Sequence, residues 1–309
     1  MDKHNLVGVV TVTYNSAGVI DDFMNSILQQ LHYDFALYIV DNASSDDTLR
    51  LVAKYQDSRV VIVRNSDNVG VAEGNNIGIR AAMKDGCDAV LLINNDTVFD
   101  SGLVSKLQDS LRDYGCEMVV PKISLCDEPE KIWCAGGYLS NWRATGRHFG
   151  YNVQDKGQFD KPRAVSYSPT CCMLIKKDVF ARVGLMDATY FAYFDDTDFC
   201  LRANRAGVRL HYVPSVRLLH KVSALTGDQS EFSARHLTRN HVYYILKNYA
   251  RWLSPLYLLA FQAQILTRCL LSRSLKTSAM TEKAFFEGIS LFLSRSKRMR
   301  SGFSLTEAQ

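Results

Sequence analysis

The stretch LLINNDT, residues 91–97, decides the fold, because an apolar run stops there abruptly at two amides and a carboxylate. Such a run predicts a buried parallel strand whose carboxyl end carries polar side chains out of the sheet. Ligands bind at strand ends of this kind in open α/β sheets. A carboxylate among small polar groups suits a hard divalent cation, which takes its other ligands from water and substrate phosphates. The stretch therefore indicates a cation-held diphosphate, with an ordinary polar turn as the alternative.

The first hundred residues alternate short β-branched runs with helix-period stretches, separated by polar turns. This alternation predicts βαβ units and a mostly parallel, doubly wound sheet flanked by helices. We expect strands near 6–13, 35–40, 60–63 and 89–93, and helices near 19–30, 46–55 and 72–84. Residues 102–167 predict a mixed or antiparallel portion that bears substrate loops. A strand at 170–176, a helix at 178–184 and an acidic cluster at 195–198, opening a helix at 199–206, follow.

Composition and cysteine usage describe a globular protein with reduced thiols. With 309 residues and 47% hydrophobic content, the chain can bury one large core, or one core and a smaller appendage. The eight cysteines form no C-x-x-C pair and no zinc-type spacing with histidine, so we expect mostly buried thiols in a cytosolic protein. The amino terminus, Met1–Asn5, lacks the basic and long apolar regions of a secretory signal.

The carboxyl-terminal part is chemically different from the rest. The segment Arg235–Arg300 contains twelve Lys and Arg against two acids, a formal charge of +10, whereas the rest of the chain sums to −6. Its apolar run 252–266 is interrupted by a proline and two glutamines, and is too short and polar to predict a transmembrane span. Apolar faces mixed with basic residues are typical of helices that lie in an anionic membrane interface. A helical subdomain packed on the core, or a dimer interface, is the alternative.

Two earlier strand ends also finish in small polar residues. The first is TVTYN, residues 11–15, and the second begins at Asp41. A carboxylate at the position of Asp41 can accept a hydrogen bond from the imide of a pyrimidine base, with Thr11 and Tyr14 as a floor. A local turn acceptor is the alternative for Asp41.

A glycine-rich segment, NVGVAEGNNIG, covers residues 68–78. Its glycines are four residues apart, so they share one face of a helix, and we expect a neighbouring group to approach this face closely. No Gly-Lys-Ser/Thr follows, so the segment is not a P-loop. It also differs from G-x-G-x-x-G, which argues against a dinucleotide oxidoreductase.

Five motifs follow one another in order: T-x-T-Y-N, V-D-N-x-S-x-D, N-x-G-x-A-x-G-N-N-x-G, L-L-I-N-N-D and Y-F-D-D-T-D-F-C-L-R. Together they resemble the family 2 glycosyltransferases of GT-A fold over about residues 6–250. The likeness is greatest to the bacterial rhamnosyltransferase-like branch that builds cell-surface polysaccharides such as O-antigen. The resemblance implies a GT-A type, Rossmann-like catalytic domain over residues 1–225 that binds a nucleotide-sugar. A helical, basic, membrane-associating region over residues 226–309 would follow it.

The resemblance also implies the donor site. Asp96 stands at the family's D-x-D position and would hold Mg²⁺ or Mn²⁺ on the donor diphosphate, and His220 falls where some relatives place a further metal or phosphate ligand. An ordinary loop histidine is the alternative for His220. Because this chain has one carboxylate where many relatives have two, we expect looser metal binding. The implied nucleotide-binding residues are Thr11, Thr13, Tyr14, Asn15, Asp41, Asn68, Gly70, Gly74 and Asn95.

The second acidic cluster is the implied catalytic group. Inverting sugar transfer needs a base that removes the proton of the acceptor hydroxyl. The family pattern assigns this role to Asp196, with Asp195 facing the acceptor and Asp198 capping or stabilising the helix. Carboxylates crowded together have raised pKa values. The alternative is that all three acids only occupy a helix N-terminus.

The resemblance thus implies an inverting glycosyltransferase that uses dTDP-rhamnose or a UDP-hexose. The acceptor would be a lipid-linked or growing cell-surface glycan at the cytoplasmic face of the inner membrane, and we expect no nucleic-acid partner. Trp133, Tyr138 and Trp142 are candidates for a sugar-stacking wall, with core packing as the alternative. A sugar-1-phosphate nucleotidyltransferase is a rival interpretation, but residues 15–18 lack its basic, Gly-rich loop. A non-catalytic glycan-binding protein is the other rival, although both acid clusters are intact.

Overall fold

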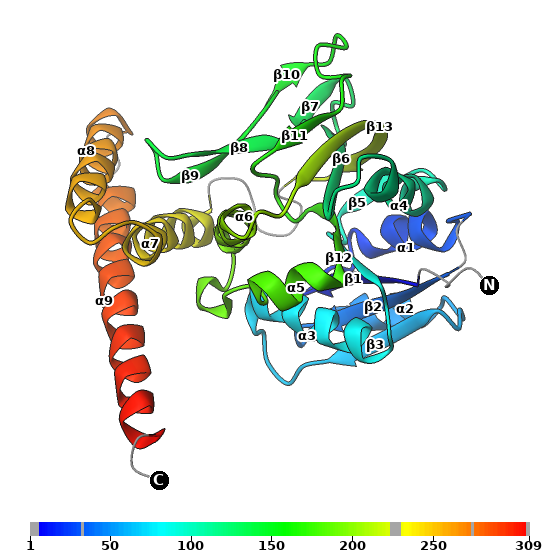
Figure 1. Ribbon diagram of the computed structural model, residues 1–309, viewed down its shortest axis with the longest axis horizontal. Coiled ribbons are helices and arrows are strands. Elements are labelled where there is room, and N and C mark those ends of the chain that lie inside the picture. The colour runs from blue at the N-terminus through cyan, green and yellow to red at the C-terminus, as the bar shows by residue number, and fades with distance from the viewer. Residues whose placement is uncertain (1–5, 32–33, 223–229, 273–274, 307–309) are drawn as a thin grey trace. The chain divides into compact units, whose positions relative to one another are not determined.

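The computed structural model of the protein describes residues 6–31, 34–222, 230–272 and 275–306 (Figure 1). Within the helices, residues 268–272, 275–278 and 297–306 are described by their backbone alone. The predictions that concern Met1–Asn5 and the Cys269 thiol lie outside the described residues. So do six basic side chains of the tail: Arg268, Arg273, Lys276, Lys297, Arg298 and Arg300.

The chain divides into two compact units. The first unit comprises Met1–Leu139 and Gly146–Leu225, and the second comprises Ser140–Thr145 and Thr226–Gln309. Within the second unit, the Arg143 carbonyl lies 3.0 Å from Nε2 of His241. The predicted domain boundary between residues 225 and 226 stays a prediction.

Parallel strands form one half of the sheet in the first unit. In spatial order they are β4 (Ala89–Ile93), β1 (Val7–Thr13), β2 (Phe35–Asp41) and β3 (Val60–Arg64). The intervening helices are α1 (Ile20–Leu28), α2 (Thr48–Val52) and α3 (Gly70–Lys84). Because these strands are parallel, the carboxyl ends of β1, β2 and β4 meet at one edge of the sheet.

Mixed strands extend the sheet beyond β4. Strand β12 (Cys172–Lys176) runs antiparallel to both β4 and β6 (Met118–Leu125). Next to β6 come β7 (Lys131–Cys134) and β10 (Val153–Gln154). Strand β13 (Leu210–His220) pairs with β6, β11 (Arg163–Val165) and β5 (Thr97–Phe99), and a hairpin joins β8 (Gly137–Ser140) to β9 (Thr145–His148). The predicted mixed character of the middle of the chain is therefore confirmed.

The strands bury apolar side chains on both faces, because successive residues point in opposite directions. On one face Val9 and Leu91 pack with α1 and α4 (Leu103–Asp113). On the other face Val10 and Leu92 pack with α3, α5 (Lys177–Val183) and α6 (Asp195–Arg205). Figure 1 shows α1 and α4 on one side of the sheet and α3 and α5 on the other. Burial on both faces explains why β4 is a continuous apolar run.

The second unit contains α7 (Glu231–Asn248), α8 (Ser254–Ser272) and α9 (Leu275–Thr306). Val242, Ile265 and Phe285, one from each helix, form a small buried core. Helices α7 and α9 approach closely at Gly288, where a Cβ atom would lie 2.5 Å from the Arg239 carbonyl oxygen. None of the described helices is both long and apolar enough to cross a bilayer.

The predicted fold class, a mostly parallel sheet flanked by helices with a helical extension, is confirmed. Two helix boundaries were wrong. Helix α2 begins only at Thr48, because Oδ1 of Asp46 accepts hydrogen bonds from the Thr48 amide and hydroxyl. Helix α6 begins at Asp195 rather than Phe199, directly after Phe194 in the left-handed region. The seven cysteines with described side chains are free thiols, and all except Cys126 are buried.

Candidate active site

The ends of β1 and β2 are neighbours in register, which pairs Thr13 with Asp41. The hydroxyls of Thr13 and Ser44 donate to Oδ1 of Asp41 at 2.8 and 2.6 Å, and the Ser44 amide donates to Oδ2 at 3.0 Å. Asp41 thus acts as the local turn acceptor that was the alternative interpretation. A carboxylate has about four acceptor positions, so capacity for one ligand bond remains.

Three more predicted nucleotide-binding residues lie at the same edge. Asn15 has a φ of 51°, and its Oδ1 accepts a hydrogen bond from the Ser45 amide at 2.8 Å. The side chain of Tyr14 is about half exposed. Thr11 is buried, and its hydroxyl has no hydrogen-bond partner among the described residues. Buried hydroxyls are normally bonded, so the Thr11 hydroxyl is an exception.

Asn95 serves the framework of the site. Its Nδ2 donates to the Val12 carbonyl at 2.7 Å and to the Ser16 hydroxyl at 3.0 Å. These bonds tie the turn after β4 to the end of β1. An amide can donate in this way and an ionised carboxylate cannot, which explains why asparagine fits here.

Asp96 and His220 are brought together by backbone pairing. Strand β5 pairs antiparallel with the end of β13, with Thr97 opposite His220, and the Lys221 amide donates to the Asp96 carbonyl at 2.9 Å. Nε2 of His220 lies 3.1 Å from Oδ1 of Asp96, although the two atoms lack the alignment of a hydrogen bond. Among the described residues, neither Oδ1 of Asp96 nor Nδ1 of His220 has a hydrogen-bond partner, and both are buried. A carboxylate oxygen and an imidazole nitrogen therefore meet at one point.

A shared cation fits Oδ1 of Asp96 and Nε2 of His220, the two atoms that lie 3.1 Å apart. The described residues contain no group of three His, Cys, Asp or Glu placed to hold a metal. Asp96 and His220 would then supply two ligands, and substrate phosphate and water the others. With two protein ligands, the cation would have coordination positions left for the phosphate of a substrate.

The start of α3 is occupied by a carbonyl of the segment 184–194, which leads from α5 to the acids of α6 and is called the acidic loop below. The amides of Val71 and Ala72 donate to the Phe191 carbonyl at 2.6 and 3.3 Å. Oδ1 of Asn68 accepts a hydrogen bond from the Gly70 amide at 3.0 Å. Gly70 has a φ of +83°, and a Cβ atom there would lie 2.5 Å from the Phe191 carbonyl oxygen. The first amides of α3 therefore hold the acidic loop.

The other glycines of α3 allow the helix to lie close to β1. A Cβ atom at Gly74 would lie 2.8 Å from a methyl group of Val12, and one at Gly78 would lie 2.3 Å from a methyl group of Val10. The predicted close approach along one face of this helix is thus confirmed, and β1 is the neighbour.

The three acids at the start of α6 have different surroundings. Asp198 is fully buried and bonded to the Tyr190 hydroxyl at 3.2 Å and to Nε of Arg202 at 2.8 Å, so it stabilises the loop and helix. Asp195 is also buried. Asp196 is more exposed than either, because it is only partly buried. Burial raises the pKa of Asp195 and of Asp196, and the charge of Asp196 raises the pKa of Asp195 further.

A strained backbone precedes these acids. Phe191, Tyr193 and Phe194 all have positive φ values, between 65° and 68°. Residues with side chains rarely adopt this conformation, and strain of this kind clusters at functional sites.

A chain of contacts links Asp96 to Asp196. The rings of His220 and Trp133 have centroids 4.5 Å apart, those of Trp133 and His148 4.9 Å, and those of His148 and Tyr167 5.8 Å. The Tyr167 hydroxyl then donates to Oδ2 of Asp196 at 3.1 Å.

A buried thiol lies near each of these carboxylates, Cys134 near Asp196 and Cys171 near Asp96. Burial raises the pKa of Cys134 and of Cys171, and the charges of Asp196 and Asp96, respectively, raise these pKa values further. Cys134 in turn lies close enough to Cys171 to raise the pKa of the Cys171 thiol. The two acid clusters therefore lie in one region of the first unit.

The three aromatic residues predicted to form a sugar-stacking wall, Trp133, Tyr138 and Trp142, have different surroundings. Trp133 packs edge-on against His148 and His220. Tyr138 lies beside Phe149, and Trp142 is at the hairpin tip, in the second unit. Core packing, the alternative interpretation, describes Trp133.

Comparison with known proteins agrees with this arrangement. The sequence profile of Glycosyl transferase family 2 matches residues 8–184. The chain belongs to this family. It is therefore a glycosyltransferase of GT-A fold, and the rival nucleotidyltransferase and non-catalytic interpretations are set aside.

Relatives of this glycosyltransferase act in bacterial glycan synthesis. It is 24% identical to the dTDP-rhamnosyl transferase RfbF of Shigella flexneri, over 72% of this chain and 69% of the relative. It is 22% identical to the N-acetylglucosaminyl-diphospho-decaprenol L-rhamnosyltransferase of Mycobacterium tuberculosis, over 87% and 95%. A solved structure of similar fold is the mannosyltransferase PcManGT of Pyrobaculum calidifontis in complex with GDP-Man and Mn²⁺, with a TM-score of 0.55, 14% identity and 93% and 86% coverage.

Sequence reasoning missed three participants in this glycosyltransferase. Tyr167 and His148 lie in the middle portion, where no motif or periodicity singles them out. Phe191 acts through its backbone carbonyl, so its side-chain type carries no signal. Only coordinates reveal these contacts.

A glycine comparison tests the contact between α3 and the acidic loop. Gly70 and Gly86 both have a φ of +83°, but only Gly70 has atoms near its missing side chain. We expect Gly86→Ala to lower the free energy of unfolding by roughly 1–2 kcal/mol, the cost of the left-handed conformation. Gly70→Ala should lower the free energy of unfolding by distinctly more than this, and it should also lower transferase activity. Urea unfolding and activity assays measure both, and equal effects of the two substitutions would contradict the contact.

Proposed function

We propose that the protein is an inverting glycosyltransferase that moves a sugar from dTDP-rhamnose or a UDP-hexose to a lipid-linked or growing cell-surface glycan. The single observation that carries the mechanism is the chain of contacts from Asp96 and His220 to Asp196. Inversion requires a leaving diphosphate on one side of the anomeric carbon and a base on the other. Two acid clusters in one region support this arrangement.

Asp196 is our candidate for the general base. It keeps solvent access, whereas Asp195 and Asp198 are buried, so an acceptor hydroxyl can reach it. Burial raises its pKa, which brings its proton affinity closer to that needed near neutral pH. Asp195 is placed beside it and would help to keep that pKa raised, as crowded carboxylates do.

Asp96 and His220 are our candidates for the metal ligands. Oδ1 of Asp96 has no hydrogen-bond partner among the described residues and lies 3.1 Å from Nε2 of His220. This pair suits a divalent cation, which when bound would neutralise the charge that gathers on the departing diphosphate. An imidazole nitrogen favours Mn²⁺ over Mg²⁺, because Mg²⁺ prefers oxygen ligands. The GT-A structural neighbour from Pyrobaculum also binds Mn²⁺.

The nucleotide would lie along the ends of β1 and β2. Thr11 offers an unpartnered hydroxyl, Asp41 a remaining acceptor position and Tyr14 a half-exposed ring. Thr13, Asn15, Asn68, Gly70, Gly74 and Asn95 would shape this edge, since their described contacts are with neighbouring protein atoms.

Replacement of the proposed base tests the mechanism. Asp196→Asn should lower turnover at least about a hundredfold, the usual scale for loss of a general base, and leave donor affinity within about twofold. Asp85→Asn is the control, because Asp85 also accepts a tyrosine hydroxyl but lies at the end of α3. The measurements are transfer kinetics and donor titration with dTDP-rhamnose and UDP-hexoses. Retained turnover in Asp196→Asn would remove Asp196 from this role.

Replacement of the proposed metal ligand tests the donor side. Asp96→Ala should weaken Mn²⁺-dependent binding of dTDP or UDP by about tenfold or more, because even outer-shell partners of a metal are worth that much. Binding without metal should change little. Titration calorimetry with and without Mn²⁺ measures both, and Asp109→Ala on the exposed face of α4 is the control. Unchanged metal-dependent binding would overturn the assignment.

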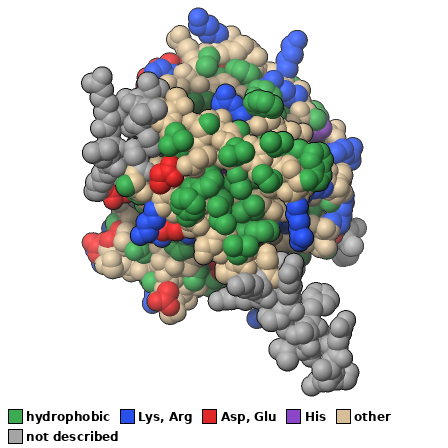
Figure 2. All heavy atoms as spheres, turned by 90° about the vertical axis from the view of Figure 1, so that its left-hand side faces the viewer, with side chains coloured by type: hydrophobic (Ala, Val, Ile, Leu, Met, Phe, Trp, Pro, Cys, Tyr) green, Lys and Arg blue, Asp and Glu red, His purple; other side chains and the backbone are tan. Residues whose placement is uncertain are grey.

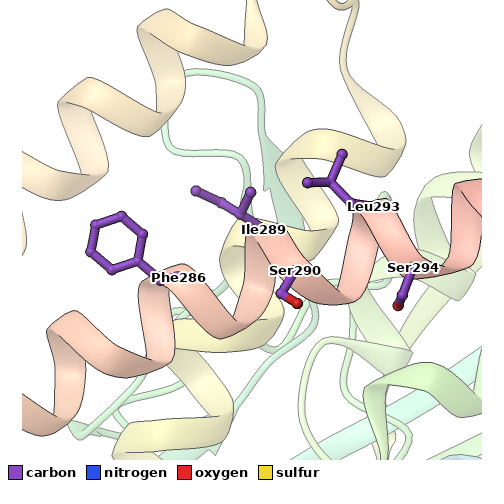
Figure 3. A pocket seen from close by; sticks show the side chains of 5 residues that line it. All are labelled: Phe286, Ile289, Ser290, Leu293 and Ser294. Carbon is purple, nitrogen blue, oxygen red and sulfur yellow. The ribbon is translucent and has the colours of Figure 1, made fainter.

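The second unit supports a peripheral membrane location. Leu256, Leu259 and Leu266 are exposed on α8, and Phe286 and Leu293 are exposed on α9. Figure 2 shows hydrophobic side chains gathered on this side, with Lys and Arg at the margins. Figure 3 shows the shallow pocket that Phe286, Ile289 and Leu293 line on α9.

An anionic bilayer surface fits these exposed side chains. The tail segment Arg235–Arg300 has a formal charge of +10, which attracts anionic lipid, while the apolar side chains can enter the acyl boundary. The relative from Mycobacterium is named for a diphospho-decaprenol substrate, a lipid. We therefore place the enzyme on the cytoplasmic face of the inner membrane, beside a lipid-linked acceptor.

Vesicle flotation tests this location. The double substitution Leu259→Glu and Phe286→Glu should reduce binding to anionic vesicles more than tenfold, because burial of each side chain contributes about 1.5–3 kcal/mol. Binding by the unaltered protein should fall with salt. Val61→Glu, at an exposed apolar position on β3, is the control. Unchanged flotation, or conversion of a dimer to a monomer instead, would contradict the membrane assignment.

A further inference from the structure

Tyr167 is buried in a cradle that holds its ring. It lies between β11 and β12, and two glycines of the β8–β9 hairpin contact the ring. A Cβ atom at Gly146 would lie 2.5 Å from the ring, and one at Gly137 would lie 3.0 Å from it. Larger residues at either position would displace the tyrosine. The hairpin therefore packs directly against this ring.

One further ring completes the cradle. His148 stacks on Tyr167 with an interplanar angle of 29°, and Nδ1 of His148 lies 3.1 Å from the Trp133 carbonyl oxygen. Burial lowers the pKa of His148 to about 4, so this histidine is neutral at pH 7 and Nδ1 carries the proton that the carbonyl accepts. The hydrogen bond fixes the imidazole, and the imidazole fixes the tyrosine.

The tyrosine in turn fixes one oxygen of Asp196. Its hydroxyl donates to Oδ2 at 3.1 Å. The other oxygen, Oδ1, accepts hydrogen bonds from the Thr197 amide at 2.5 Å and the Thr197 hydroxyl at 3.1 Å. Both carboxylate oxygens are thus held, and Oδ2, which accepts one hydrogen bond, keeps a further lone pair for an incoming hydroxyl.

We infer that Tyr167 is a positioning residue that orients Asp196 toward the acceptor hydroxyl, with Gly137, Gly146 and His148 setting the place of its ring. This inference rests on the proposed role of Asp196 as the base. Tyr167 touches neither sugar in this account and acts through the carboxylate alone.

The hydrogen bond has a predictable effect on the titration of Asp196. Besides Tyr167, the ionisable groups close to Asp196 are Asp195 and Asp198 on α6, Cys200 on α6 and Cys134 on β7. Burial raises the pKa of Asp196, whereas the tyrosine hydroxyl, which bonds the ionised form, lowers it. Removal of the hydroxyl therefore raises this pKa and leaves less of the base ionised at neutral pH.

The pH profile of Tyr167→Phe tests the inference. The acidic limb of kcat/KM should move upward by about one pH unit, the scale of a hydrogen bond to a charged group. Loss of kcat should be about tenfold below the limb and smaller above it, with donor KM nearly unchanged. Tyr38→Phe is the matched control, because Tyr38 is buried and donates to the Asp85 carboxylate at 2.7 Å. A limb that does not move would overturn the inference.

A second variant guards against a folding defect. Gly146→Ala keeps the tyrosine hydroxyl but intrudes on the ring, so it should lower kcat and shift the limb in the same direction. Unaltered kinetics in a folded Gly146→Ala protein would count against the cradle. Failure of the proposed function gives a different result from failure of the positioning role. If Asp196 is not the base, Asp196→Asn keeps its turnover. If only the positioning role is wrong, Asp196→Asn is inactive and the acidic limb of the Tyr167→Phe profile does not move.

Discussion

The candidate site depends on the antiparallel pairing of β5 with the end of β13. This pairing sets Thr97 opposite His220 and bonds the Lys221 amide to the Asp96 carbonyl. Backbone hydrogen bonds thus bring a carboxylate from the parallel half of the sheet to an imidazole from its last strand. Where the two side chains meet, Oδ1 of Asp96 faces Nε2 of His220 and has no hydrogen-bond partner among the described residues. An unsatisfied carboxylate oxygen is costly in a buried site unless a ligand completes it.

Helix α3 joins this donor side to the acidic loop. Its glycines let it lie against β1, and its first amides hold the Phe191 carbonyl. Asn76 adds two hydrogen bonds of 2.9 Å to the backbone of Met186, one to the amide and one to the carbonyl. One helix therefore contacts both β1, which ends at the proposed nucleotide edge, and the loop that leads to Asp196. The rings from His220 to Tyr167 make a second connection between the same two sides.

Much of the fold follows from the sequence, because βαβ units are local and periodic. Three features of the sequence were enough to predict the parallel half of the sheet and the edge that carries Asp41 and Asp96. They are the apolar run at β4, the strand and helix alternation before it, and the polar residues at the strand ends. The ordered motifs identified the family. Contacts that join distant segments could not be predicted: Tyr167 and His148 lie among short strands without periodicity, and Gly70 is needed because of the Phe191 carbonyl. Asn95 was assigned to the nucleotide, yet its amide bonds Val12 and Ser16.

The central claim is that Asp96, His220 and Asp196 act on one sugar. A crystal structure of the enzyme with Mn²⁺ and an unreactive nucleotide-sugar analogue, recorded with the anomalous signal of manganese, tests it most directly. The account predicts one manganese peak in contact with both Asp96 and His220, and an anomeric carbon between that peak and the Asp196 carboxylate. A manganese peak away from these two residues, or a sugar that does not face Asp196, would contradict it.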